Sequence, residues 1–98
     1  MAYVNWTEQS IDDLLNIADF IGKDSVRYSK IQIKRIRERV RLLRNHPYLG
    51  RVVPEYENES IRELILGNYR IIYRIISEER IDILTVHHSA KRLRFDIK

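Results

Sequence analysis

The chain has 98 residues, 44% of them hydrophobic and 33% charged, with a formal net charge of +4 at pH 7. This length predicts a single domain over residues 1–98, and the hydrophobic content excludes wholesale disorder. No apolar run approaches the roughly 18 residues of a membrane-spanning helix. We expect no export signal, because the N-terminus lacks a basic region followed by an apolar one. The absence of cysteine excludes disulfides, thiolate metal sites and thiol nucleophiles, and it fits a reducing cytoplasm.

The charge is unevenly distributed along the chain. Residues 1–24 carry five acidic and one basic side chain, and residues 25–45 carry one acidic and eight basic side chains. Residues 46–98 are nearly balanced, with eight acidic and nine basic side chains. The middle segment therefore predicts either a partner that bears carboxylates or phosphates, or a solvated basic surface beside an acidic neighbour.

Residues 2–6 are expected to form a short strand, which a first helix follows. Thr7 is the expected N-cap of this helix and Gly22 marks its end. The apolar residues of the helix have the three-to-four spacing of one helical face. They are Ile11, Leu14, Leu15, Ala18 and Ile21.

A second helix is expected over residues 25–45, with Asp24 as its candidate N-cap and Pro47 enforcing its end. One stripe of this helix comprises Val26, Ser29, Ile33, Ile36, Val40 and Leu43. The connection between the two helices is only two or three residues long, so they should form an antiparallel hairpin. The hairpin should bury its apolar stripes against one face of a sheet.

After a loop over residues 46–60 the pattern changes to strands. Three segments rich in apolar, β-branched and aromatic residues are separated by short turns, which predicts an antiparallel meander. These segments are residues 61–66, 69–76 and 81–86. The predicted order is therefore β-α-α-β-β-β, an α+β fold in which an N-terminal helical hairpin packs on a small antiparallel sheet.

Alternate residues of the segment 69–76 should face opposite sides of the sheet. One side carries Tyr69, Ile71, Tyr73 and Ile75, and the other carries Arg70, Ile72, Arg74 and Ile76. The mixture of arginine and isoleucine on the second side predicts either a functional concave face or the solvent side of a two-layer domain.

Most motifs that carry chemistry are absent from the sequence. There is no phosphate-binding glycine loop, metalloprotease helix motif, calcium loop or serine in a nucleophile elbow. His87 and His88 are adjacent in an extended segment and should point to opposite sides, while His46 lies in a loop. We therefore expect no metal site and no cofactor.

Residue types suited to one reaction, the metal-free cleavage of RNA, are nevertheless present. This reaction needs a general base, a general acid and cations that stabilise the phosphorane. Arg70 and Arg74 are suited to grip phosphate, and His87 or His88 to exchange protons near neutral pH. In the alternative interpretation the arginines pair with carboxylates and one histidine packs against the sheet edge. The candidate carboxylates are Glu63, Asp82 or those of an acidic partner.

Four segments in order resemble the RelE/ParE superfamily of bacterial toxins. They are residues 50–55 (GRVVPE), 61–64 (IREL), 67–75 (GNYRIIYRI) and 83–88 (ILTVHH). Trp6 and residues 11–14 (IDDL) also resemble that superfamily. No single motif is diagnostic, but the ordered combination covers nearly the whole chain.

The resemblance implies the toxin of a type II toxin–antitoxin module. Such toxins are cytoplasmic and are neutralised by a cognate antitoxin whose C-terminal segment wraps across the toxin. The complex commonly represses its own operon, with operator DNA bound through the antitoxin. A basic toxin complements an acidic segment that folds on binding, so the composition agrees with this expectation.

Two activities occur in this superfamily. RelE-like members cut mRNA on the ribosome, and ParE-like members inhibit DNA gyrase by protein–protein binding. Arg70 matches a phosphate-contacting arginine of RelE-like enzymes, but their lysines have no counterpart in residues 61–66. Ser89 and Phe95 stand near the positions where those enzymes have an arginine and a tyrosine.

The resemblance therefore favours a ParE-like gyrase inhibitor, with a RelE-like mRNA interferase as the alternative. Arg70, His87 and His88 are expected to be catalytic only in the RelE-like case. The basic segment over residues 25–45 is then expected to be a protein-docking or solvated surface. The other candidate binding residues are Arg62, Arg74, Arg92 and Arg94.

Overall fold

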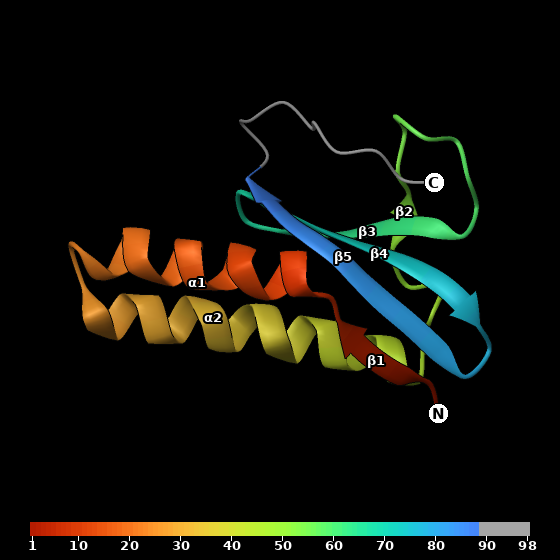
Figure 1. Ribbon diagram of the computed structural model, residues 1–98, viewed down its shortest axis with the longest axis horizontal. Helices are drawn as coiled ribbons and strands as arrows, with labels where there is room; N and C mark the ends of the chain where they lie inside the picture. Colours follow the sequence, from red (N-terminus) through yellow and green to blue (C-terminus); the bar gives the residue numbers. More distant parts are fainter. Residues whose placement is uncertain (89–98) are drawn as a thin grey trace.

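The computed structural model describes residues 1–88, in which two helices cover one face of a five-stranded sheet (Figure 1). The elements are β1 (Tyr3–Trp6), α1 (Glu8–Gly22), α2 (Val26–Arg41), the short 3₁₀ helix η1 (Leu42–Arg44), β2 (Arg51–Val52), β3 (Ile61–Leu66), β4 (Tyr69–Ser77) and β5 (Arg80–His88). The predicted α+β class is confirmed, and the predicted elements occur in the predicted order with β2 as an additional strand. None of the helices among residues 1–88 combines the length and apolar character needed to cross a membrane.

The two helices begin at hydroxyl caps. Thr7 caps α1 as predicted, since its hydroxyl accepts a hydrogen bond from the Ser10 backbone N–H at 3.3 Å. The prediction of Asp24 as the cap of α2 is wrong. The Asp24 N–H is bound to the last turn of α1, so Ser25 is the first extended residue and its hydroxyl accepts from the Tyr28 N–H at 3.0 Å.

The sheet has the strand order β1-β5-β4-β3-β2. The antiparallel meander of β3, β4 and β5 is confirmed, but the complete sheet is mixed because β1 pairs with β5 in parallel. The loop predicted over residues 46–60 also contains β2, which pairs antiparallel with β3. Two residues are too few to show strand periodicity, and β1 is distant from β5 in sequence, so neither pairing left a local signal.

The main core lies between the helices and the sheet. It is built from buried aliphatic residues of α2, β3, β4 and β5 around Tyr73, which is fully buried. The Tyr73 hydroxyl donates to the Pro47 carbonyl at 2.7 Å and accepts from the Gly50 N–H at 2.9 Å. Burial raises the pKa of Tyr73. The loop before β2 is thus tied to the centre of the core.

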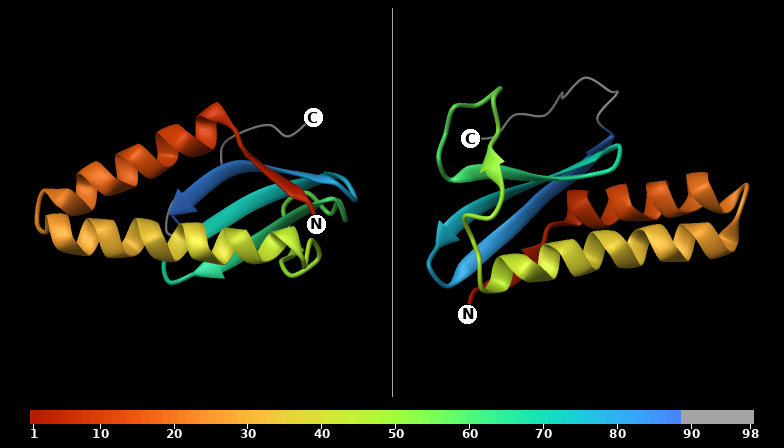
Figure 2. Two further views of the ribbon diagram at one scale, coloured as in Figure 1. Left: turned by 90° about the horizontal axis from the view of Figure 1, so that it is seen from below. Right: turned by 180° about the vertical axis from the view of Figure 1, so that it is seen from behind.

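The predicted apolar stripes of the helices are buried only in part. Ile11, Leu15 and Val26 are 46%, 59% and 62% exposed, while Ser29 and Gln32 of α2 are buried. The closed end of the hairpin projects beyond the sheet (Figures 1 and 2), so apolar residues near that end have no strand to pack against. On the rest of the hairpin, the surface facing the sheet is narrower than the apolar surface of the helices.

The opposite face of the sheet, here called the outer face, is partly covered. Ile72 packs there with Val53 and Ile61, and Tyr56 and Leu84 flank this small cluster. The predicted division of β4 is therefore confirmed, because Ile71 and Tyr73 belong to the core beneath the helices. The segment that follows β2 makes the outer face a packed surface over the middle of the sheet.

Candidate functional site

Arg70 lies on the outer face, where it is held by two carboxylates. Its Nε donates to Glu63 Oε1 at 2.6 Å, and its two terminal nitrogens donate to the Glu55 carboxylate at 2.7 and 2.8 Å. The side chain is only 13% exposed. Hydrogen bonding to Arg70 lowers the pKa of Glu55 to about 2, and the same pairing raises the pKa of Arg70 above its ordinary value.

Glu63 is the centre of this arrangement. Its side chain has no exposed surface, and its second oxygen accepts from Arg51 Nε at 2.7 Å. Because Arg51 stands opposite Glu63 in the β2–β3 pairing, the carboxylate lies between an arginine on each side. We call Arg51, Glu55, Glu63 and Arg70 the outer-face ion network. A buried carboxylate without its partners costs about 3–5 kcal/mol, so the network opposes release of Arg70.

Two of the three catalytic candidates lie together in the structure, and the third lies apart from them. His87 is the cross-strand partner of Arg70, and Tyr69 is the cross-strand partner of His88. The Tyr69 and His88 rings meet edge to face, with centroids 5.5 Å apart, and burial raises the pKa of Tyr69. Adjacent residues of a strand point to opposite faces, so Arg70 and His87 share the outer face and His88 lies on the helix side.

The candidate binding arginines are dispersed. Arg74 lies in β4 opposite Ile61 on one side and Asp82 on the other. Arg62 holds the loop before β2, since its Nη1 donates to the Gly50 carbonyl at 3.0 Å and its guanidinium lies 4.8 Å from the centre of the Tyr48 ring. Arg92, Arg94, Ser89 and Phe95 lie outside the described residues.

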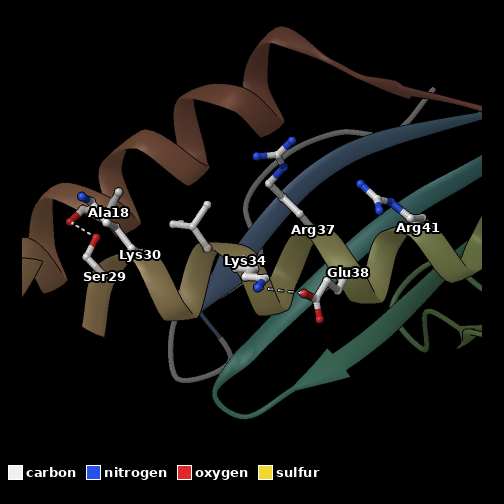
Figure 3. Close-up of a pocket in the computed structure, with 8 residues that line it drawn as sticks. Ala18, Ser29, Lys30, Lys34, Arg37, Glu38 and Arg41 are labelled. Atoms are coloured by element: carbon white, nitrogen blue, oxygen red, sulfur yellow. Dashed lines mark hydrogen bonds and ion pairs between the residues drawn. The ribbon is translucent and has the colours of Figure 1, made fainter. Parts of the chain in front are cut away.

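A groove between the two helices was missed by the sequence analysis. It has a volume of about 630 Å³ and lies along α2 beside Ala18 of α1 (Figure 3). The Ser29 hydroxyl donates to the Ala18 carbonyl at 2.8 Å at one end of the groove and ties the helices together. The lining residues are Ala18, Ser29, Lys30, Ile33, Lys34, Arg37, Glu38 and Arg41.

The two walls of this groove differ in chemistry. On the α1 side the groove is lined by Ala18. Ile11 and Leu15 precede Ala18 by seven and three residues, so they continue the same side of α1 beyond the lining, and both are exposed. The α2 wall carries four basic side chains along consecutive turns. Its single acidic side chain, Glu38, faces Lys34 at 3.8 Å in an exposed pair that is weak because water screens it. The sequence signal closest to this groove is the run of basic residues over 25–45, four of which line it.

No group of three potential metal-ligating side chains occurs within residues 1–88. Charged side chains of these residues form the outer-face ion network and the basic wall of the groove. Such charged surfaces suit the binding of a macromolecule.

Comparisons with known proteins agree with this architecture. A family model described as the ParE toxin of the type II toxin–antitoxin system parDE matches residues 4–93. A solved structure described as the chromosomal ParDE TA system from P. aeruginosa superimposes with a TM-score of 0.74 and 23% sequence identity. The alignment covers 90% of this chain and 96% of that chain, and it shows a shared fold. No relative among curated proteins matches the chain. The resemblance described from the sequence is confirmed, on its ParE side.

Proposed function

The chain belongs to the ParE toxin family of type II toxin–antitoxin systems, and from this premise we propose that it inhibits DNA gyrase by protein–protein binding. It acts in the cytoplasm, where a cognate antitoxin neutralises it. The complex binds operator DNA through the antitoxin. The alternative to gyrase inhibition by binding is the cleavage of RNA.

The pairing of Arg70 carries the proposal. An arginine that grips phosphate must present N–H donors to it, but three of the five N–H donors of Arg70 are already used by Glu55 and Glu63 at 2.6–2.8 Å. The two carboxylates also repel an incoming phosphate. Freeing Arg70 would leave Glu63 buried with Arg51 as its remaining partner. These contacts support a binding mode of action in which the outer face is structural.

The groove between α1 and α2 supports the antitoxin as a partner. The acidic side of an amphipathic helix complements the four basic side chains of the groove, and its apolar side complements Ala18 in the groove and the exposed Leu15 beside it. Antitoxin segments that are disordered when free gain this helix only on binding, so apolar contact and charge pairing must together offset the ordering cost. We propose that the C-terminal segment of the antitoxin occupies the groove.

A supercoiling assay tests the proposed target. Purified toxin at stoichiometric amounts should stop gyrase from supercoiling relaxed plasmid, and prior addition of the antitoxin should restore the activity. A translation assay run in parallel should show intact mRNA. Full supercoiling activity in the presence of excess folded toxin contradicts the proposal.

The adjacency of Arg70 and His87 on the outer face favours a second candidate, a ribosome-dependent mRNA interferase. In this case Arg70 stabilises the transition-state phosphate and His87 exchanges the proton, which requires the outer-face ion network to open on the ribosome. Growth arrest should then be lost in Arg70→Ala and His87→Ala, with His88→Ala as the control on the helix side. Undiminished toxicity of the two outer-face variants eliminates this candidate.

A further inference from the structure

A second hollow lies between β1 and the C-terminal half of α2. Its volume is about 260 Å³, and Val4 and Val40 contribute the apolar part of its lining. The remaining lining residues are Tyr3, Trp6, Arg37, Arg41 and Arg44. The three arginines are spaced i, i+4 and i+7, which places them on one side of α2 and its extension η1. We call these five residues the arginine–aromatic hollow.

The arginines of this hollow have no ion-pair partner among the described residues. In contrast, Arg51, Arg70 and Arg80 each pair with a carboxylate at 2.6–2.9 Å. Three full positive charges exceed the partial negative charge of roughly half an electron at the C-terminus of a helix. The hollow therefore presents positive charge that no described residue of the chain compensates.

Two aromatic rings stand beside these charges. Tyr3 is 65% exposed, and Trp6 is half-buried because it also packs against the core. A guanidinium group binds a phosphate through two parallel hydrogen bonds, and an aromatic face stacks on a base or sugar. The combination of arginines with two aromatic rings, one of them exposed, favours a nucleic acid over an acidic helix, because the hollow offers only Val4 and Val40 to the apolar side of such a helix.

We propose that the arginine–aromatic hollow binds the phosphodiester backbone of a nucleic acid. Arg27, Lys30 and Lys34 continue the cationic line along α2 towards its N-terminus. From Arg27 to Arg44 the line spans about 25 Å at 1.5 Å per residue. A strand anchored in the hollow therefore has further positive charge along its course. The proposal does not depend on gyrase inhibition, and its failure leaves that function intact. Arg37 and Arg41 also line the larger groove, so the nucleic acid and the antitoxin segment compete for them.

Trp6 makes the binding directly measurable, because it is the single tryptophan of the chain. The full-length toxin is titrated with a fluorescein-labelled 20-base-pair DNA duplex and with an RNA of the same charge, while Trp6 emission and fluorescein anisotropy are recorded. We expect a dissociation constant of about 1–100 µM and, for three phosphate contacts, a log–log salt slope of about −2.7. Comparison of the DNA and RNA titrations shows which of the two nucleic acids the hollow prefers. Polyglutamate of equal charge is the competing ligand.

Two variants of equal charge change separate the hollow from the general basic character. Arg37→Glu/Arg41→Glu/Arg44→Glu should weaken binding by about 30-fold or more and abolish the change in Trp6 emission. The matched control, Lys23→Glu/Arg35→Glu/Arg39→Glu, changes three basic residues outside the hollow and the cationic line. It should retain the Trp6 response and lose only a few-fold in affinity. Circular dichroism melts verify folding, and Tyr3→Ala, which keeps every charge, provides an independent test because it should weaken binding through lost stacking. Equal losses in both triple variants, equally tight binding of polyglutamate, or an unresponsive Trp6 overturns the proposal.

Discussion

The carboxylate of Asp13 in α1 accepts a hydrogen bond from the backbone N–H of Val86 in β5 at 3.0 Å. The same oxygen also accepts from the hydroxyl of Thr85. β1 pairs with β5 only as far as Ile83, so the following stretch of β5 is an uncovered edge. A helix side chain thus takes the place of a strand partner there, which protects the edge from pairing with another chain.

Removing this contact should destabilise the fold. Asp13→Ala leaves the N–H of Val86 and the hydroxyl of buried Thr85 without their acceptor, at a cost of about 1–3 kcal/mol for each unsatisfied group. Urea denaturation followed by circular dichroism measures the loss. Asp12→Ala, at an exposed neighbouring position, should change the free energy of unfolding by less than about 0.5 kcal/mol. Equal stabilities of the two variants would refute the capping role of Asp13.

The outer-face ion network predicts a specific loss of stability in acid. The pKa of Glu55 falls from 4.5 to about 2 in the folded chain because Arg70 hydrogen-bonds its charged form. A depressed pKa contributes stability above the unfolded value and loses it as the pH falls towards the folded value. The difference in unfolding free energy between the wild-type chain and Glu55→Gln should therefore shrink between pH 4.5 and 2. A difference that is constant across this interval contradicts the pairing of Glu55 with Arg70.

Gly50 should tolerate no side chain. A Cβ at this position would lie 2.5 Å from the Glu63 carbonyl oxygen and 2.7 Å from the Tyr73 hydroxyl, so the backbone or the core must move. Gly50→Ala should lower the free energy of unfolding by about 1–3 kcal/mol. Gly22→Ala is the matched control, because nothing lies within 4 Å of its Cβ and alanine favours the helix by about 0.5–1 kcal/mol. Relative to the wild-type chain, the melting temperature should fall for Gly50→Ala and rise for Gly22→Ala.

The exposed side of α1 next to the groove predicts which apolar residue the antitoxin needs, because Leu15 lies one helical turn before the lining residue Ala18. Leu15 and Phe20 are 59% and 71% exposed, but five residues place them about 140° apart around the helix. Leu15→Asp should weaken antitoxin binding by about 10–100-fold, since an apolar contact at the centre of an interface is worth 1–3 kcal/mol. Phe20→Asp should change the affinity little. Calorimetric titration of each variant with the antitoxin measures these affinities. A larger loss for Phe20→Asp than for Leu15→Asp would place the antitoxin on the other side of α1.

Much of the fold follows from local sequence patterns. The capping hydroxyl of Thr7, the short connection between the helices and the three β-rich segments are local features, so they predicted the helical hairpin and the meander. The pairing of β1 with β5 and the two residues of β2 were missed, because these contacts join segments distant in sequence or too short for periodicity.

The candidate site was predicted less completely for the same physical reason. Alternation placed Arg70 and Arg74 on one face and directed His87 and His88 to opposite sides, but only the strand register shows that His87 is the one beside Arg70. The second carboxylate on Arg70 comes from Glu55, in the irregular segment after β2. The groove was missed because periodicity identifies the apolar side of a helix without showing how much of it the sheet covers.

The class of fold, the family and the concentration of positive charge in residues 25–45 follow from the sequence, since each depends on residue type and local spacing. The exposure of Leu15, the pairing of Arg70 with two carboxylates, and the hollow that Arg37, Arg41 and Arg44 line with Tyr3 and Trp6 follow from the packing of the folded chain. The burial and the ion pairs of a side chain depend on residues that are distant in sequence but close in the fold. These residues come together only when the helices pack on the sheet.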